Sequence, residues 1–206
     1  GRAPREVGRG RGARSQPLPV DPRGAPARAG PSRRPHPAAE MALLDVLASW
    51  AKERADRPFL LHAGRSVSYG ELDRLSNRMA HALVGFGVRR GDRVSLGMGN
   101  SVEYVTAALG VLKAGAILNP INPALGAGEL EYILAHAEPR IILTDVANAP
   151  QLEGVRRPAA SRLVIPGKDL DGLLRAAPET LPVARPGPDD YSTLLYTSVT
   201  TGQPQG

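Results

Sequence analysis

Between residues 93 and 177, short apolar runs alternate with amphipathic stretches of helical length, and this alternation constrains the fold more than any other feature. The expected strands are residues 93–98, AILNPINP, RIILTD and SRLVIP, and the expected helices are SVEYVTAALGVLKAG, LGAGELEYILAHAEP and DLDGLLRAA. Strands that alternate with helices of about 10–15 residues imply a parallel sheet wrapped by crossover helices. Apolar runs such as RIILT fit strands that are buried on both faces. The expected fold class is therefore α/β, with a mostly parallel sheet and flanking helices.

The residues on either side of this region extend the pattern. Apolar spacing predicts a helix that begins at Leu43 and ends before Pro58, followed by two short strands around Ala63-Gly64. A second helix is predicted from Leu72 to Phe86, because apolar residues recur there at every third or fourth position. Near the C-terminus, STLLYTS is predicted to be a further strand that leads directly into a terminal loop.

Residues 1–40 differ in composition from the remainder of the chain. They hold nine Arg against three acidic residues, with eight Pro and six Gly, whereas residues 41–206 hold 17 basic and 17 acidic side chains. The formal net charge of +6 therefore belongs to this tail, and the body of the chain has no basic excess that would indicate nucleic-acid binding. Because the tail has no aromatic residue and few large aliphatic ones, we expect it to be disordered.

Met41 stands directly before the first periodic apolar segment. We therefore expect the natural protein to begin at or near Met41, with residues 1–40 as upstream sequence. An Arg-rich, acid-poor start also suggests a mitochondrial transit peptide, but its eight prolines oppose the amphipathic helix that such a peptide needs. A polyanion-binding arm is a third interpretation of the same residues.

Several chemistries find no support in the sequence. Cysteine is absent, which excludes disulfides and thiolate zinc sites, and no apolar run approaches the ~18 residues of a membrane span. The four histidines stand far apart without ligand spacing, so no metal site is expected, and there is no G-x-S-x-G motif of a hydrolase. A cytoplasmic protein is the default expectation.

The GMGN turn at residues 97–100 partly resembles a dinucleotide-binding fingerprint, because it lies between a predicted strand and a predicted helix. A third glycine would be needed where the chain has Val102, and no clear acidic partner ends the next strand. We interpret GMGN as a tight strand-to-helix turn, with Asn100 or Ser101 as the N-cap of the helix.

The terminal loop carries the strongest chemical signal. Four hydroxyl side chains, those of Thr197, Ser198, Thr200 and Thr201, lie within five residues at the end of a predicted strand. Glycines such as Gly202 let the backbone turn sharply, and exposed backbone N–H groups with small hydroxyls around them favour phosphate oxygens. Hydroxyl content alone leaves two interpretations open, a phosphate-binding loop and a polar loop at a strand end.

Order and spacing add a family resemblance. YTSVTTGQPQG resembles YTSGTTGxPKG, the phosphate-binding loop of the adenylate-forming superfamily, which includes acyl-CoA synthetases and nonribosomal peptide adenylation domains. SVSYGELDRLSNRMAHAL and LKAGAILNPINP resemble two further motifs of that family, in the same order. The resemblance covers residues 41–206 and implies that they form a partial N-terminal adenylation domain, its first α/β subdomain.

The resemblance implies a two-step reaction in which a carboxylic acid attacks ATP to give an acyl-adenylate and a thiol, commonly that of coenzyme A, then displaces AMP. Residues at the matching loop positions would bind the ATP phosphates with Mg²⁺ present; these are Thr197, Ser198, Thr200, Thr201, Gly202 and Gln205. Two departures weaken the match, since Val199 replaces a glycine and Gln205 replaces a lysine. In the family, the remaining catalytic and metal-binding motifs follow this loop, so no catalytic residue is expected in this chain.

Three functions stay open at this level. The first is a segment of an AMP-forming carboxylic acid–CoA ligase, acting on a fatty or other small acid, and inactive as this polypeptide. The second is a noncatalytic remnant that serves as a binding or interaction module, which Val199 and Gln205 would suit. The third is a fragment of a nonribosomal peptide adenylation domain.

Overall fold

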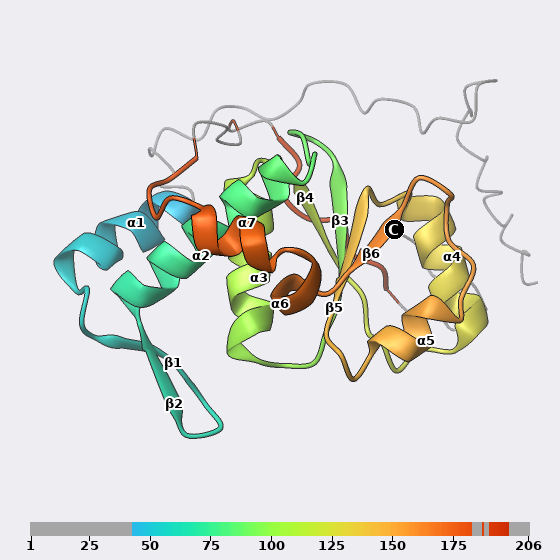
Figure 1. The fold of residues 1–206 in the computed structure, drawn as a ribbon, viewed down its shortest axis with the longest axis horizontal. Coiled ribbons are helices and arrows are strands. Elements are labelled where there is room, and N and C mark those ends of the chain that lie inside the picture. The colour runs from blue at the N-terminus through green and yellow to red at the C-terminus, as the bar shows by residue number, and fades with distance from the viewer. Residues whose placement is uncertain (1–42, 183–186, 188–189, 198–206) are drawn as a thin grey trace, which may run out of the picture. The chain divides into compact units, whose positions relative to one another are not determined.

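The computed structural model describes residues 43–182, 187 and 190–197 of the chain. The arrangement of the elements can be followed in Figure 1. In chain order they are α1 (Leu43–Glu53), β1 (Pro58–His62), β2 (Arg65–Ser68), α2 (Tyr69–Gly85), β3 (Arg93–Gly97), α3 (Val102–Lys113), β4 (Ile117–Pro120), α4 (Ala127–Ala137), β5 (Ile141–Thr144), α5 (Ala149–Glu153), β6 (Arg162–Val164), α6 (Pro166–Asp169) and α7 (Asp171–Ala176). The predicted tail, residues 1–40, lies outside the described residues.

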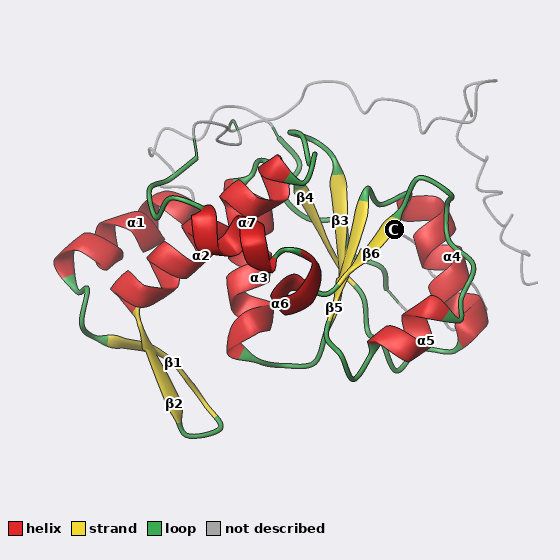
Figure 2. Cartoon of the chain, viewed as in Figure 1, coloured by secondary structure: helices red, strands yellow, loops and turns green. Residues whose placement is uncertain are grey.

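The centre of the fold is a parallel sheet with the strand order β4-β3-β5-β6, as the α/β prediction requires. Figure 2 shows helices on both faces of this sheet. Ile141 and Leu143 of β5 belong to the core cluster beneath α2 and α3, whereas Ile142 belongs to the cluster beneath α4 and α5. All four residues of β5 are buried, which explains why RIILT reads as a continuous apolar run rather than an alternating one.

The predicted hairpin is present as the antiparallel pair β1 and β2. Ala63 and Gly64, the two turn residues, have φ angles of 48° and 79°. Left-handed backbone at both central residues is what a tight two-residue hairpin turn demands, and glycine adopts it without a steric penalty. Ser68 at the end of β2 caps α2 by accepting a hydrogen bond from the backbone N–H of Glu71.

α2 and α3 pack closely because a glycine lies at their contact. A methyl group added at Gly110 would stand 2.4 Å from Cγ and 2.7 Å from Cβ of Met79, so only glycine fits at this distance. The two helices together cover one face of the sheet, with Leu83 and Val111 fully buried in the shared core cluster. A small residue thus sets the helix separation on which that face of the core depends.

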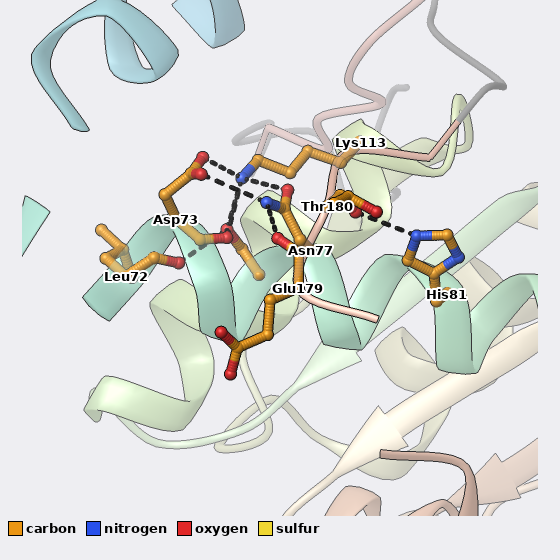
Figure 3. A network of polar contacts seen from close by, with 8 residues as sticks. Leu72, Asp73, Asn77, His81, Lys113, Glu179 and Thr180 are labelled. Carbon is orange, nitrogen blue, oxygen red and sulfur yellow. Dashed lines mark hydrogen bonds and ion pairs between the residues drawn. The ribbon is translucent and has the colours of Figure 1, made fainter. Parts of the chain in front are cut away.

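A buried polar network fixes the same two helices to a later segment of the chain (Figure 3). The Lys113 ammonium group, whose side chain is 2% exposed, donates to Asp73 Oδ1 at 2.7 Å, Ser76 Oγ at 2.7 Å and Asn77 Oδ1 at 2.8 Å. Asn77 in turn donates to the backbone oxygen of Glu179 at 2.6 Å. A buried charge is tolerated only when it is paired and hydrogen-bonded in this way.

One predicted strand does not form as expected. STLLYTS was predicted to be a full strand, but the structure gives isolated bridges at Thr193, which pairs in parallel with Leu118 of β4, and at Thr197. Leu118 donates to Ser192 O and accepts from Leu194 N, at 2.9 and 2.8 Å. The next residue of β4 that faces this way is Pro120, which has no N–H to donate, so the ladder cannot continue. The prediction also missed the short helices α5 and α6.

Candidate phosphate-loop site

The predicted site begins where the described chain ends. Of the six residues expected to bind the ATP phosphates, Thr197 is described and is exposed to solvent. The other five lie outside the described residues; they are Ser198, Thr200, Thr201, Gly202 and Gln205. The structure therefore shows how the approach to the loop is built, and it leaves the predicted phosphate contacts as predictions.

The approach segment, residues 192–197, joins the parallel sheet at the outer edge of β4 through the two hydrogen bonds to Leu118. Its direction is parallel to β4, so its C-terminal end points toward the edge of the sheet where β3 and β5 also end. In open α/β sheets, ligands bind outside the carboxyl ends of the strands. The segment therefore delivers Thr197 toward the edge at which a ligand is expected.

A second contact holds the segment near Thr197. The Tyr196 hydroxyl and Nδ1 of His136, on α4, form a hydrogen bond at 2.7 Å, and the two rings meet edge to face with centroids 5.7 Å apart. Burial raises the pKa of the Tyr196 phenol, and nearby Tyr132 raises it further while Arg93 lowers it. The phenol is consequently neutral at physiological pH.

The carboxyl ends of β3 and β5 are joined by Asp145, which follows β5. One of its carboxylate oxygens accepts from the backbone N–H of Gly99 at 2.8 Å, and the other accepts from the backbone N–H of Asn148 at 2.8 Å. Burial raises the pKa of Asp145, but these bonds, with those from the Asn148 side chain and Ala147, outweigh it and hold the pKa below its usual value.

The Asp145 carboxylate also makes the GMGN turn unsuitable for binding a phosphate. The N–H of Gly99, which a phosphate would need, is already donated to Asp145, and the carboxylate would repel an anion placed there. A methyl group at Gly97 would stand 2.7 Å from Leu152, so this glycine serves packing. Ser101, one of the two predicted N-caps, accepts from the N–H of Tyr104. The turn is a strand-to-helix connection, as interpreted from the sequence.

His136 is one of the four histidines for which the sequence shows no ligand spacing, and sequence reasoning did not connect it with the loop. It does lie on α4, but its ring contacts Tyr196, which is 60 residues later in the chain. The signal available in the sequence was the spacing of Tyr132 and His136, four residues apart on one helix, which places their rings together. Nothing in that spacing identifies Tyr196 as the third partner.

The described residues also bear on metal sites and membrane spans. Within the described ranges, no group of three or more His, Asp or Glu side chains is placed to hold a metal ion. None of the helices in the described part of the chain has the length and apolar character needed to cross a membrane.

An open parallel sheet with helices on both faces places the domain in the α/β class, in which ligands bind outside the carboxyl ends of the strands. The particular family follows from sequence comparison. Residues 47–206 match the family model described as AMP-binding enzyme, so the chain belongs to the AMP-binding enzyme family. This result agrees with the resemblance seen in the three motifs.

Relatives and solved structures agree with this assignment. The chain is 35% identical over 144 residues to the long-chain-fatty-acid–CoA ligase FadD13 of Mycobacterium tuberculosis, covering 68% of this chain and 29% of that protein. It is 34% identical over 168 residues to the syringomycin synthase SyrB1 of Pseudomonas syringae pv. syringae, covering 80% and 26%. A crystal structure of the anthranilate CoA ligase AuaEII in complex with anthranoyl-AMP superposes with a TM-score of 0.71 at 32% identity, covering 78% and 32%. The chain thus spans less than a third of the length of each of these proteins.

Proposed function

We propose that this chain is the N-terminal segment of an AMP-forming carboxylic acid–CoA ligase. The observation that carries the proposal is the family match, which runs through to the hydroxyl-rich loop. Two relatives point to the acyl-CoA branch, since one is named a long-chain-fatty-acid–CoA ligase and another a 3-hydroxybenzoate–CoA ligase. The substrate would be a carboxylic acid, and the location we propose is the cytoplasm.

In the proposed reaction, a carboxylate oxygen attacks the α-phosphorus of ATP, the bond to the bridging oxygen breaks, and pyrophosphate leaves with its electron pair. The thiol of coenzyme A then attacks the acyl carbon and AMP departs. Hydroxyls of Thr197, Ser198, Thr200 and Thr201, with the backbone of Gly202, would donate hydrogen bonds to the β- and γ-phosphates. Gln205 would add a neutral donor. Mg²⁺ bound with the nucleotide would lower the phosphates' charge.

The loop residues that depart from the family pattern offer one test. Val199 is β-branched and is poorly suited to close phosphate approach, and Gln205 brings no positive charge. In a polypeptide that includes the rest of the ligase, Val199→Gly with Gln205→Lys should lower the KM for ATP. Unchanged kinetics would mean that these positions do not limit phosphate binding.

The main test is the reading frame beyond Gly206. Continuation into an adenine-binding motif and a C-terminal lysine would support the ligase, whereas a stop codon would favour the noncatalytic remnant. As a biochemical check, the 206-residue chain should show no carboxylate-dependent exchange of pyrophosphate into ATP, and detectable exchange would contradict our assignment of the missing motifs.

A nonribosomal peptide adenylation domain is the second candidate, favoured by the 34% identity to SyrB1. The two candidates differ in the acceptor of the acyl group, since the synthetase would pass it to a carrier-domain thiol rather than to free coenzyme A. A carrier-domain sequence after the adenylation domain would favour this second candidate.

We further propose that residues 41–206 form the functional segment and that residues 1–40 are dispensable. Deletion of residues 1–40 should leave nucleotide binding unchanged. Loss of binding on deletion, with steep salt dependence in the intact chain, would instead support a polyanion-binding arm.

A further inference from the structure

The segment that leads into the loop is held at three places, one of which is an isolated backbone bridge at Thr197. Residues 192–194 are fixed by backbone hydrogen bonds to Leu118, and Tyr196 is fixed by its side chain on α4. Thr197, the first predicted phosphate-binding residue, follows Tyr196 directly. The Tyr196 contact is therefore the last described side-chain contact before the loop.

Three aromatic rings make up this contact, which we call the aromatic anchor (Tyr132, His136 and Tyr196). The His136 ring lies parallel to the Tyr132 ring with centroids 6.1 Å apart, and it meets Tyr196 at an interplanar angle of 86°. Tyr132 and Tyr196 also pack against the core cluster beneath α4. α4 carries both Tyr132 and His136, so the platform is built on a single helix.

The geometry of an extended chain links the anchor to the loop. Successive side chains of an extended segment point to opposite sides, so fixing Tyr196 toward α4 directs Thr197 away from it. Tyr196 is half-buried and Thr197 is exposed, as this alternation requires. Without the anchor, Tyr196 would lie between the bonds to Leu118 and the backbone bridge at Thr197 with a side chain free to change rotamer, so ordering it on phosphate binding would cost conformational entropy.

We propose that His136 and Tyr196 are positioning residues, whose hydrogen bond on the Tyr132 platform fixes the start of the phosphate loop and presents Thr197 to the nucleotide phosphates. This inference rests on the proposed function of the loop and names residues outside the loop that the site depends on. It assigns a role to one face of α4 that the sequence motifs do not include.

The first experiment measures local order in the 206-residue chain without ligand. Tyr196→Phe removes the hydroxyl and keeps the ring, and Tyr191→Phe is the matched control because Tyr191 is 82% exposed. By NMR relaxation, the backbone order parameter of Thr197 should fall from about 0.85 to below about 0.6 in Tyr196→Phe, while that of Leu194 stays unchanged. An unchanged order parameter of Thr197 in a Tyr196→Phe chain that unfolds like the parent would overturn the inference.

The second experiment measures binding of Mg·ATP to the same chains by NMR titration. Tyr196→Phe and His136→Ala should each weaken binding about fivefold, which is the effect of losing one hydrogen bond. His136→Asn, which can place an amide near the position of Nδ1, should restore most of the affinity. The double variant should bind no more weakly than either single variant, since both remove the same bond.

The outcomes separate the inference from the function on which it rests. If the parent chain bound no Mg·ATP, the order parameters of Thr197 would decide the inference, and the ATP kinetics of the longer polypeptide would decide the proposed function of the loop. If the parent bound Mg·ATP and all variants bound it equally, the positioning role would be wrong and the proposed function would stand. His81→Ala is the control for histidine loss, because His81 contacts Thr180 on another part of the chain.

Discussion

The face of the sheet covered by α2 and α3 and the segment at residues 192–197 are held in very different ways. On the helical face, a buried lysine meets three partners in α2, a glycine sets the helix distance, and a core cluster spans three strands. The segment has two backbone hydrogen bonds to Leu118, the side-chain contact of Tyr196 and an isolated backbone bridge at Thr197. The scaffold is thus fixed by many mutually dependent contacts, whereas the part that carries the expected chemistry is fixed by few.

This contrast separates stability from function in the molecule. Substitutions on the helical face should lower the free energy of unfolding and leave the segment's local order alone. Substitutions in the segment should lower its local order and leave the free energy of unfolding nearly unchanged. A substitution in one region that produced the effect expected of the other would contradict this comparison. The expected effects of four substitutions can be ordered by the contacts that each removes or disturbs.

The largest effect should come from Lys113→Met. The variant removes the ammonium group and leaves Ser76 Oγ, Asn77 Oδ1 and the Asp73 carboxylate without their shared donor. Breaking a buried ion pair by removing one partner costs about 3 kcal/mol of unfolding free energy. Urea denaturation would measure this, with exposed Lys168→Met as control. A loss near that of the control would show that the network contributes little.

The next largest effect should come from Gly110→Ala. The added methyl group must displace Met79 or separate α2 from α3, and overpacking of this kind costs about 2 kcal/mol. Gly128→Ala on α4 is the matched control, because a methyl group there meets nothing within 4 Å. The control should be neutral or slightly stabilising, since alanine favours a helix. Equal effects at both sites would contradict a close helix contact.

A smaller effect, dependent on pH, should follow Asp145→Asn at the carboxyl edge of the sheet. The pKa of Asp145 is held below its usual value, so its contribution to stability is present above the unfolded pKa of about 4 and is lost as the pH falls through the lower folded pKa. At pH 7 the variant should lose about 1 kcal/mol, and the difference should shrink below about pH 4. Urea denaturation at both pH values, with exposed Asp56→Asn as control, gives the answer. A stability difference between variant and parent that increased in acid would contradict this prediction.

The smallest effect on global stability should come from Tyr196→Phe. The ring and its packing against α4 are retained, and the hydroxyl bond lies at the end of a lightly held segment. We expect the free energy of unfolding to change by less than about 0.5 kcal/mol, because surface substitutions rarely exceed that. A loss comparable to that of Gly110→Ala would mean that the segment belongs to the cooperative core.

Most of the scaffold could be predicted from the sequence because its elements are locally encoded. The apolar spacing along α2, the buried run in β5 and the cap at Ser101 each report local structure, and the observed elements follow them. Pairing over long distances is not encoded in this way. Residues 192–198 have the composition of a strand, yet whether they pair depends on Pro120, which lies 72 residues before the start of the segment.

The candidate site was identified by its resemblance to a family motif rather than by the chemistry of its side chains. Hydroxyl content left two interpretations of the loop open, and order with two upstream motifs favoured one of them. The contacts that support the loop were not accessible to that reasoning. The partners of Lys113 lie 36 to 40 residues away and the partner of Tyr196 lies 60 residues away, and neither spacing has a periodicity to detect. Charge and size suggest that such residues need partners, but only the fold identifies them.

The position of residues 192–194 at the outer edge of β4 has a consequence for how the chain acquires its structure. The contacts β3–β4 and β3–β5 join strands that are near in sequence, whereas Thr193 must find Leu118 after β5 and β6 have intervened. At a synthesis rate of about 5–20 residues per second, this edge is completed seconds after the strands around it have left the ribosome. The nascent sheet therefore keeps β4 unpaired on that side until residues 192–194 have been synthesised.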